Sequence, residues 1–291
     1  MKKKRLLIIG CGDIAKRAIK LLKGRCHLYG LIRNPANIPI LRELEVTPVI
    51  GDLDIPSSLA RLAGLAEMIL HTVPPPTTGD IDSRTTHLLN ALTKGAMVPQ
   101  RLVYISTSGV YGNCQGDFVS ETRPVNPQTG RAKRRVNAEE QLRQWGKKFG
   151  VDICVLRAPG IYAIDRLPLE RIKEGLPAII SEEDSYTNHI HAMDLARISI
   201  AGLWQTSAGR IFNATDGDSL KMGDYFDLIA DSLRLPRPPR VSRDIAQKML
   251  PSSLLSFTEE SRRLINSRLQ KELKIRLWYK SVEIALEREL H

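Results

Sequence analysis

The sequence has few cysteines and no long hydrophobic run. The four cysteines show no C-x-x-C spacing, so neither a zinc site nor a disulfide framework is indicated. We therefore expect a reducing, cytoplasmic compartment and no bound metal. The basic residues 2–5 are followed by an apolar run that spans only Leu6–Ile9, which is too short for a signal peptide or a membrane segment.

Aromatic residues are also scarce, at 5% of the chain, and they do not alternate with the basic residues. A surface that stacks single-stranded nucleic acid needs such aromatic partners. The net charge of +11 is spread over several segments, so a solvated basic surface is the favoured interpretation and nucleic-acid binding the less favoured one. With 42% hydrophobic residues over 291 positions, the chain can fold around a sizeable core.

The N-terminal stretch predicts a dinucleotide site. Leu6–Ile9 reads as a strand buried on both faces of a parallel sheet, and a helical pattern follows from about Asp13 to Leu22. Between them lies a G-x-G-x-x-A turn, whose glycines allow the backbone to approach a phosphate at the N-terminus of the helix. The alternative is a glycine turn that binds no ligand. The cofactor contacts expected from this turn are Gly10, Cys11, Gly12, Asp13 and Ile14.

Strand-like and helix-like segments then alternate, which predicts an α/β fold with a doubly wound parallel sheet. The further strands expected are His27–Ile32, Val46–Ile50, Met68–Val73, Arg101–Ser106, Asp152–Leu156 and Arg210–Ala214. The helices expected are one capped by Ser57, then 83–94, 129–149, and one that opens within Thr187–Asp194 and runs to Trp204. We expect a dinucleotide-binding Rossmann domain of residues 1–163, rejoined by 188–215, and a smaller C-terminal substrate lobe of residues 164–187 and 216–291.

Arg33 at the end of the second strand favours NADP over NAD. An acidic residue at this place binds the ribose hydroxyl in NAD sites, whereas a guanidinium suits a 2′-phosphate. The alternative is an ordinary surface arginine. Loops at the carboxyl ends of the strands form the ligand crevice of such a sheet, and the crevice residues expected there are Arg33, Asn34, Asp52, Leu53, Val73 and Pro74.

Four segments resemble one family closely. They are Gly51-Asp52-Leu53, Tyr104-Ile-Ser-Thr-Ser-Gly-Val-Tyr-Gly112, Leu156-Arg157 with Tyr162, and the stretch from Asn188 to Asp194. Through them the first 215 residues or so resemble the extended, NAD-dependent epimerase/dehydratase-like branch of the short-chain dehydrogenase/reductase superfamily. The resemblance implies an oxidoreductase or epimerase in which Asp52 meets the adenine and Thr107 bonds the reacting oxygen. It also places Ser106 and Pro159 at the cofactor, and implies a homodimer formed through the two long helices.

The chain departs from the family where the family has its acid/base pair. The family reads Tyr-x-x-x-Lys with a glutamate four residues further on; aligning that glutamate with Glu139 puts Arg135 at the lysine and Arg131 at the tyrosine. Arginine does not release its proton near neutral pH, so the usual chemistry is in doubt. The two arginines would instead bind a substrate carboxylate or phosphate, or form a surface charge run with Glu139 and Glu140. Tyr111 is the nearest phenol in sequence to Thr107, and is a candidate substitute acid.

Two functions remain open from the sequence. The first is an atypical NADP-linked oxidoreductase or epimerase that acts on a small polar, anionic or sugar-like substrate. The second is a non-catalytic dinucleotide sensor or scaffold that kept the fold and lost the chemistry. His71 is expected to be a core histidine, and His191 with Asp194 a helix cap that closes the crevice rather than a metal site.

Overall fold

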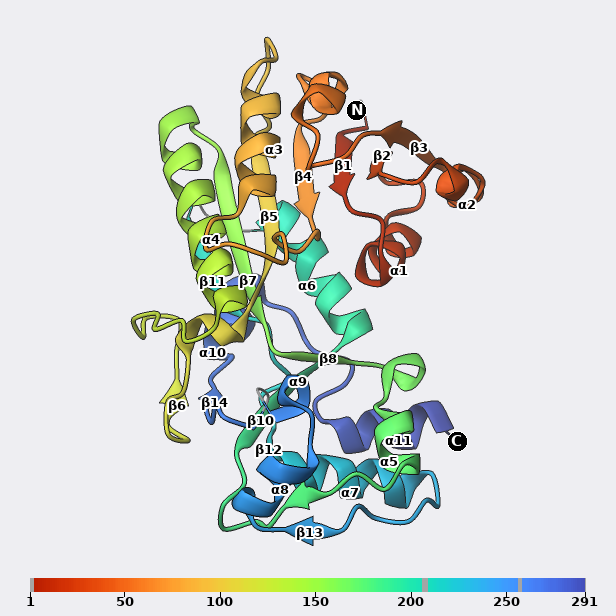
Figure 1. Cartoon of the computed structure of the whole chain (residues 1–291). Coiled ribbons are helices and arrows are strands. Elements are labelled where there is room, and N and C mark those ends of the chain that lie inside the picture. Colours follow the sequence, from red (N-terminus) through yellow and green to blue (C-terminus); the bar gives the residue numbers. More distant parts are fainter. Residues whose placement is uncertain (1–2, 206–208, 256–257, 291) are drawn as a thin grey trace.

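A seven-stranded parallel sheet organises the molecule (Figure 1). The computed structural model describes residues 3–205, 209–255 and 258–290, so small parts of both predicted domains lie outside the described residues. The sheet order is β11-β7-β5-β4-β1-β2-β3, which runs outward from β1 in both directions. The predicted doubly wound fold is therefore confirmed. The strands are β1 Arg5–Ile9, β2 His27–Ile32, β3 Val46–Ile50, β4 Met68–His71, β5 Arg101–Thr107, β7 Asp152–Ala158 and β11 Arg210–Asn213.

Helices cover both faces of this sheet because side chains alternate along each buried strand. Leu6 and Ile8 of β1 join one apolar core, and Leu7 and Ile9 join the other. The first core is closed by α1 Asp13–Leu22, α6 Ala192–Gln205 and α10 Ser267–Leu273; the second by the 3-10 helix η2 Pro56–Leu62, α3 Ser83–Thr93 and α4 Gly130–Phe149. In Figure 1, α3 and α4 stand side by side on their face. Among the described residues no helix is long and apolar enough to cross a membrane.

A second group of elements gathers at the carboxyl end of the sheet, below it in Figure 1. A three-stranded sheet has the order β12-β10-β8, and two strand pairs, β13 with β9 and β14 with β6, flank it. These strands are β6 Phe118–Val119, β8 Gly160–Tyr162, β9 Ala178–Ile179, β10 Tyr186–His191, β12 Ser219–Lys221, β13 Arg240–Val241 and β14 Arg263–Leu264. The helices are α5 Leu169–Lys173, α7 Met222–Ser232, α8 Arg243–Met249, α9 Ser252–Leu255 and α11 Val282–Leu290. Short elements elsewhere are η1 Pro35–Asn37, α2 Ile38–Glu43, η3 Ser108–Tyr111 and η4 Ile164–Arg166.

The structure corrects two of the expected elements. Thr187–His191 belongs to strand β10, and the helix begins only at Ala192, because this stretch pairs with β8 on one side and β12 on the other. The segment after β3 is a 3-10 helix that begins at Pro56, with Ile55 and not Ser57 at its N-cap. The hydroxyl that organises this turn is that of Ser58, which donates to the Ile55 carbonyl at 2.7 Å.

Candidate active site

The carboxyl ends of the first four strands enclose a cavity of about 490 Å³. Nine of the expected cofactor residues line it: Gly10, Cys11, Gly12, Arg33, Asn34, Asp52, Leu53, Val73 and Pro74. Sequence reasoning missed Arg84 of α3, which lines the same cavity, pairs with Asp54 at 2.6 Å and donates to the Pro74 carbonyl. No short motif marks Arg84, because it reaches the cavity from the helix that follows the proline loop.

The glycine turn fits a phosphate. Gly10 has φ +87°, and a Cβ there would lie 2.4 Å from Val73 Cγ2, so only glycine is accommodated. A Cβ at Gly12 would meet no protein atom within 4 Å, which leaves space at the start of α1. Gly12 is the N-cap of this ten-residue helix and supplies no side-chain cap, so backbone N–H groups and the positive end of the helix dipole face that space. The residues present therefore fit a dinucleotide pyrophosphate.

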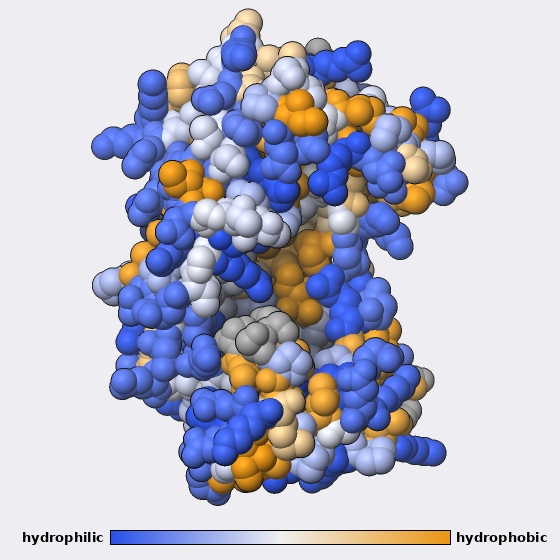
Figure 2. Space-filling model, in the orientation of Figure 1, coloured by the Kyte–Doolittle hydropathy of each residue, from blue (hydrophilic) through white to orange (hydrophobic). Residues whose placement is uncertain are grey.

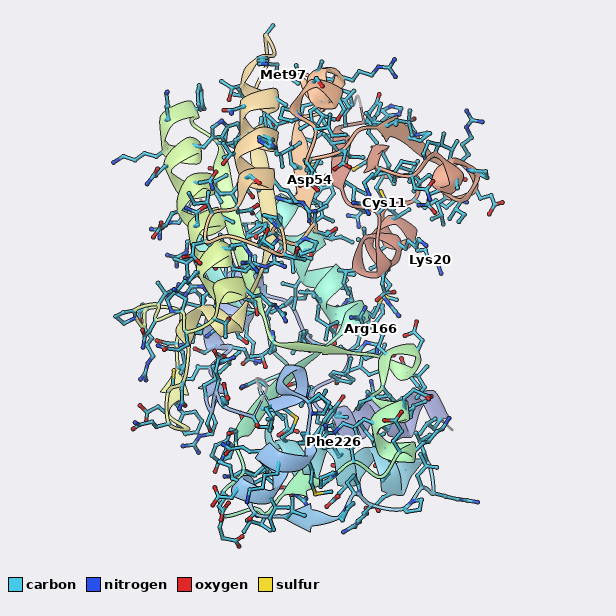
Figure 3. The ribbon with its side chains drawn as sticks, in the orientation of Figure 1. Cys11, Lys20, Asp54, Met97, Arg166 and Phe226 are labelled. Atoms are coloured by element: carbon cyan, nitrogen blue, oxygen red, sulfur yellow. The ribbon has the colours of Figure 1, made fainter. Side chains whose placement is uncertain are left out.

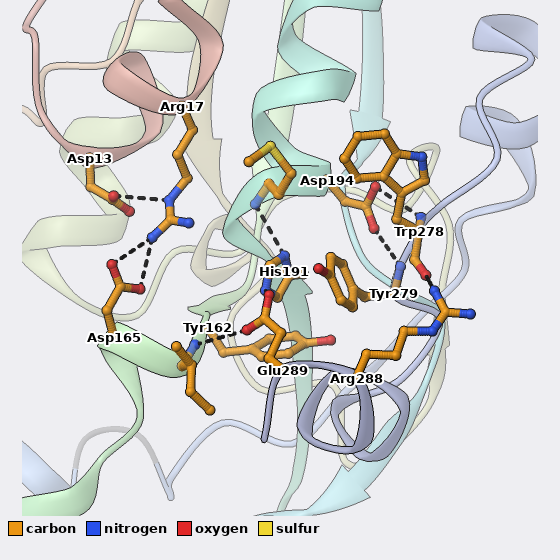
Figure 4. Close-up of polar contacts among 12 residues, drawn as sticks. Asp13, Arg17, Tyr162, Asp165, His191, Asp194, Trp278, Tyr279, Arg288 and Glu289 are labelled. Atoms are coloured by element: carbon orange, nitrogen blue, oxygen red, sulfur yellow. Dashed lines mark hydrogen bonds and ion pairs between the residues drawn. The ribbon is translucent and has the colours of Figure 1, made fainter. Parts of the chain in front are cut away.

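Asp13 follows the glycine turn but is fully engaged by arginines. Its carboxylate accepts from Arg17 Nε and from Arg166 Nη1, both at 2.9 Å. Arg17 in turn donates twice to Asp165, at 2.8 Å each (Figure 4). These four side chains form an ion-pair clasp between α1 and η4. Because two cations offset two anions, the Asp13 charge does not oppose an anion at the helix N-terminus.

The cavity also contains an arginine without a hydrogen-bond partner among the described residues. Arg33 is exposed, and within the described part of the chain its guanidinium makes no hydrogen bond or ion pair. Asn34 beside it is committed to the backbone, since its side chain accepts from Ala36 N at 3.0 Å. The Ile14 side chain does not face this cavity; it is 9% exposed and belongs to the core under α1.

A second cavity, also of about 490 Å³, lies between the central sheet and the lower elements. Figure 2 shows this face of the molecule hollowed between the two parts, with hydrophobic side chains at the floor. Arg166, at the waist in Figure 3, lines this cavity and also belongs to the clasp. Thr107, Arg131 and Pro159 of the expected site line it as well. The clasp thus borders the second cavity through Arg166, and its Asp13 directly follows Gly12, which lines the first.

Thr107 and Arg131 present free polar groups to the second cavity. Thr107 Oγ1 accepts from Gly109 N at 3.2 Å, so its hydroxyl hydrogen remains available to a ligand. Arg131 makes no hydrogen bond or ion pair with any described residue. Arg131 is exposed overall, but partial desolvation of its guanidinium and then the neighbouring charge of Arg135 lower its pKa, while the charge of Glu260 raises it. From its ordinary value above 12, the guanidinium stays protonated at neutral pH.

The other expected catalytic and cofactor side chains point into the protein. The Tyr111 hydroxyl donates to Asn213 Oδ1 at 2.7 Å, its side chain is 1% exposed, and burial raises its pKa. Arg135 Nη1 donates to the Tyr104 hydroxyl at 2.9 Å and to the Ile105 carbonyl at 2.7 Å. Ser106 Oγ donates to Glu139 Oε1 at 2.6 Å. In this arrangement Tyr111, Arg135 and Ser106 support the end of β5, and none of their side chains offers a proton to the cavity.

Comparison with known proteins shows which family the segment around the second cavity is similar to. Residues 83–214, which include Thr107, Arg131 and Pro159, match the model of the NAD dependent epimerase/dehydratase family. We call residues 83–214 the epimerase/dehydratase segment after this match. The resemblance read from the sequence motifs is confirmed in this segment. A candidate UDP-glucose 4-epimerase from Methanocaldococcus jannaschii is 22% identical over 142 residues, which cover 44% of this chain and 46% of that relative, so the match spans about half the length of each.

Solved structures extend the similarity of the epimerase/dehydratase segment to the whole fold. A conserved protein of unknown function from Silicibacter pomeroyi is 26% identical, with a TM-score of 0.79 over 98% of this chain and 97% of that one. A UDP-glucuronic acid 4-epimerase from Bacillus cereus, solved with UDP-glucuronic acid and NAD, is 19% identical, with a TM-score of 0.77 over 98% of this chain and 97% of that one. At 19% identity the second likeness shows the fold alone.

A buried ion pair braces the epimerase/dehydratase segment behind the cavity. Glu139 of α4 and Arg157 of β7 are 2.7 Å apart, and each side chain is 5% exposed. The interpretation that Glu139 pairs with arginines of its own helix is therefore wrong. Burial by itself lowers the pKa of Arg157, but the hydrogen bonds and charge of Glu139 outweigh it and raise the pKa. Since Glu139 also holds Ser106, the pair fixes the carboxyl ends of β5 and β7 together.

The lower wall of the second cavity comes from residues that sequence reasoning did not assign to it. His189 stacks on Tyr225 with ring centroids 4.1 Å apart, and burial lowers the pKa of His189 to about 3, so its ring is neutral. Phe226, labelled in the lower part of Figure 3, and Tyr186 complete this aromatic side. Glu260 and Arg262 close the cavity from the C-terminal segment. They follow Thr107 by more than 150 residues, and no local pattern marks them.

His71, His191 and Asp194 have structural roles in the described residues. His71 is 1% exposed on β4, and burial lowers its pKa to about 3, as expected of a core histidine. Asp194 is fully buried and accepts from the backbone N–H groups of Trp278 and Tyr279 at 3.0 and 2.8 Å (Figure 4). His191 lies 3.2 Å from Glu289 of α11. Both residues tie the C-terminal segment to α6, and no cluster in the described part of the chain could hold a metal ion.

Proposed function

We propose that this protein is an NADP-linked oxidoreductase or epimerase of the short-chain type, acting on an anionic, sugar-like substrate. The observation that carries the proposal is the pair of cavities, one lined by the glycine turn and the other by Thr107 and Arg131. One cavity has the glycine turn and an uncommitted arginine, which suits a phosphorylated dinucleotide. The other has a free threonine hydroxyl and an uncommitted arginine, which suits a hydroxylated anion.

Arg33 supports the preference for NADP. It lines the first cavity and forms no ion pair with any described residue, although its charge acts at longer range on Asp54, which pairs with Arg84. A 2′-phosphate would supply that partner, and charge-assisted hydrogen bonds of this kind are worth about 1.5–3 kcal/mol. The Bacillus cereus structure contains NAD, so the preference of this chain rests on Arg33 alone.

The second cavity supports an anionic substrate. Arg131 is uncommitted, while Arg166 and Arg262 line the same wall with their charges shared with Asp13 and Glu260. An arginine binds a carboxylate or phosphate through two parallel hydrogen bonds. The aromatic side formed by His189 and Tyr225 offers a flat apolar surface to a sugar or base ring. A nucleoside-diphosphate sugar with an acidic sugar, such as the UDP-glucuronic acid bound by the Bacillus cereus enzyme, combines these features.

In this proposal the chain binds and orients, and the bound nicotinamide accepts or returns hydride. Gly10 and Gly12 would admit the pyrophosphate to the N-terminus of α1, and Asp52 would border the adenosine. Thr107 would hold the reacting oxygen through its free hydroxyl hydrogen. Arg131 would bind the acid group of the substrate, since a guanidinium cannot take the proton.

One observation favours a non-catalytic sensor as the second candidate. The position of the family tyrosine holds Arg131, and the position of its lysine holds Arg135, whose Nη1 is already bound to Tyr104 and Ile105. A sensor would need the dinucleotide cavity but no proton acceptor in the second cavity. It predicts tight NADPH binding that does not change when Thr107 is replaced by alanine.

Titration of the purified protein with NADPH and NADH, followed by nucleotide fluorescence, tests the proposal. We expect Arg33→Ala to weaken NADPH binding about ten- to a hundred-fold, the equivalent of 1.5–3 kcal/mol, and to leave NADH unchanged. Arg42→Ala is the matched control, because Arg42 is an exposed arginine on the neighbouring helix α2. No binding of either nucleotide at millimolar concentration would reject both candidate functions.

Incubation with NADP and UDP-glucuronic acid or UDP-glucose then separates enzyme from sensor. For an enzyme, Thr107→Ala lowers the turnover measured by nicotinamide absorbance or by sugar interconversion. For a sensor, neither the parent protein nor the variant turns over any of these compounds. The family also suggests a homodimer through α3 and α4, which sedimentation of the purified protein would establish.

A further inference from the structure

The second cavity contains a carboxylate where the family phenol is missing. Glu260 lines the cavity, its side chain is 14% exposed, and it lies 2.7 Å from Arg262 Nη1. The same arginine donates to the Gly112 carbonyl at 2.7 Å, which fixes the C-terminal segment to the loop after β5. Arg131 lines the same cavity, and the charge of Glu260 acts on it. Glu260 is therefore a mostly buried carboxylate whose position is fixed by Arg262. It lies in the cavity that Arg131, aligned with the family tyrosine, also lines.

The space above Gly109 lies between Glu260 and Thr107. A carbon added at the Cβ position of Gly109 would lie 3.6 Å from both Thr107 Oγ1 and Thr107 Cγ2, and 3.9 Å from Glu260 Oε2. The two oxygens therefore lie near each other across Gly109, close enough for one substrate to reach both. The residues come from β5 and from the C-terminal segment, so the fold alone brings them together.

We propose that Glu260 is the proton acceptor of this site and that, with Thr107, it holds the reacting hydroxyl of the substrate. This inference rests on the proposed function, which supplies the oxidised nicotinamide as hydride acceptor. The substrate O–H bond breaks and its proton moves to the Glu260 carboxylate. The adjacent C–H bond breaks with its electron pair, which leaves as hydride to the nicotinamide, and the carbon–oxygen double bond forms. In an epimerase the same groups return the proton and hydride.

Three other groups near Glu260 could not replace it. Arg131 and Arg262 hold their protons near neutral pH. The charge of Glu260 also acts on Cys114. This cysteine is 2% exposed, and burial raises the pKa of its thiol. Among these neighbours Glu260 is the group whose ionised form can accept a proton, so it should control the acid side of the pH profile.

The test uses the full-length protein loaded with NADP and three variants. Glu260→Gln keeps an oxygen for Arg262 but cannot accept a proton, and Glu259→Gln is the matched control because Glu259 is its exposed neighbour. Gly109→Ala fills the shared space, where the added carbon makes only ordinary contacts of 3.6 Å or more. For each protein, turnover of UDP-glucuronic acid and UDP-glucose is measured against pH, and binding of both sugar nucleotides by calorimetry.

We expect Glu260→Gln to lower kcat about 10²- to 10⁴-fold, the usual range for a general base, and to remove the acid limb of the kcat/KM profile. Gly109→Ala should weaken sugar-nucleotide binding while Glu259→Gln matches the parent protein in both measurements. If Glu260→Gln keeps the kcat and pH profile of Glu259→Gln, Glu260 only anchors Arg262 and the inference fails, although the proposed function stands. If NADP binds but no sugar nucleotide binds or reacts, the assignment of the cavity and of Glu260 fails while dinucleotide binding stands. If no dinucleotide binds, the proposed function itself fails.

Discussion

Removing the carboxylate of Glu139 should destabilise the protein more than removing the carboxylate of an exposed glutamate. Glu139→Gln leaves the guanidinium of Arg157 buried without a counter-charge, since both side chains are 5% exposed and 2.7 Å apart. Breaking a buried pair in this way costs about 3–5 kcal/mol, which is a large part of the roughly 5–15 kcal/mol that stabilises a typical protein. The amide would still accept from Ser106, so the loss reports mainly the missing charge.

Urea unfolding followed by tryptophan fluorescence measures this loss. With an m-value of about 3 kcal/mol/M, the midpoint should fall by about 1 M or more. Glu140→Gln is the control, because Glu140 is the exposed next residue of α4, and surface changes of this kind usually stay within about 0.5 kcal/mol. The double variant Glu139→Leu with Arg157→Met should recover most of the stability, since replacing a buried pair by apolar groups is often neutral.

Equal midpoints for Glu139→Gln and Glu140→Gln would refute this reasoning. Such a result would mean that Arg157 reaches water or another acceptor when Glu139 loses its charge. The bracing of β5 against β7 would then come from backbone pairing alone. Because Ser106 precedes Thr107, a destabilised variant should also lose turnover through poorer placement of the threonine hydroxyl.

Two further predictions concern stability. Gly10→Ala should destabilise the protein by about 1–3 kcal/mol more than Gly24→Ala. Both glycines have positive φ, but only a Cβ at Gly10 would clash, 2.4 Å from Val73 Cγ2. Equal losses of stability for the two variants in urea unfolding would count against the clash. His71 is neutral when folded, with a pKa of about 3, and binds a proton near pH 6.5 when unfolded. The unfolded state thus binds more protons as the pH falls below about 6.5, and His71 should contribute a loss of about 2 kcal/mol between neutral pH and pH 5. His71→Asn should lose less over that range than the exposed-site variant His27→Asn, and parallel pH profiles would contradict the pKa.

Much of the first cavity could be predicted from the sequence because its residues lie at the ends of short, strongly patterned segments. Gly10, Arg33 and Asp52 each follow a short segment whose pattern predicts a strand, and the carboxyl ends of parallel strands meet at one edge. Knowing the strand positions is then enough to bring these residues together. The glycine turn could be recognised without knowing the tertiary structure, because a positive φ at one residue by itself favours glycine.

The second cavity was decided by tertiary packing. Thr187–His191 has a pattern open to helix or strand, and pairing with β8 and β12 made it a strand. The rotation of α4 about its axis decides which of its arginines faces the cavity. Arg131 lines the cavity, whereas Arg135 donates to the Tyr104 hydroxyl of the sheet.

The sequence by itself predicted a dinucleotide site at the glycine turn and, from the alignment on Glu139, arginines in place of the family's phenol and amine. The tertiary structure decided which groups share the second cavity with Thr107. Glu260 reaches that space from a segment more than 150 residues away, held there by the contact of Arg262 with the Gly112 carbonyl. Contacts of this range arise from packing of the whole chain rather than from local pattern, and so only the folded structure shows them.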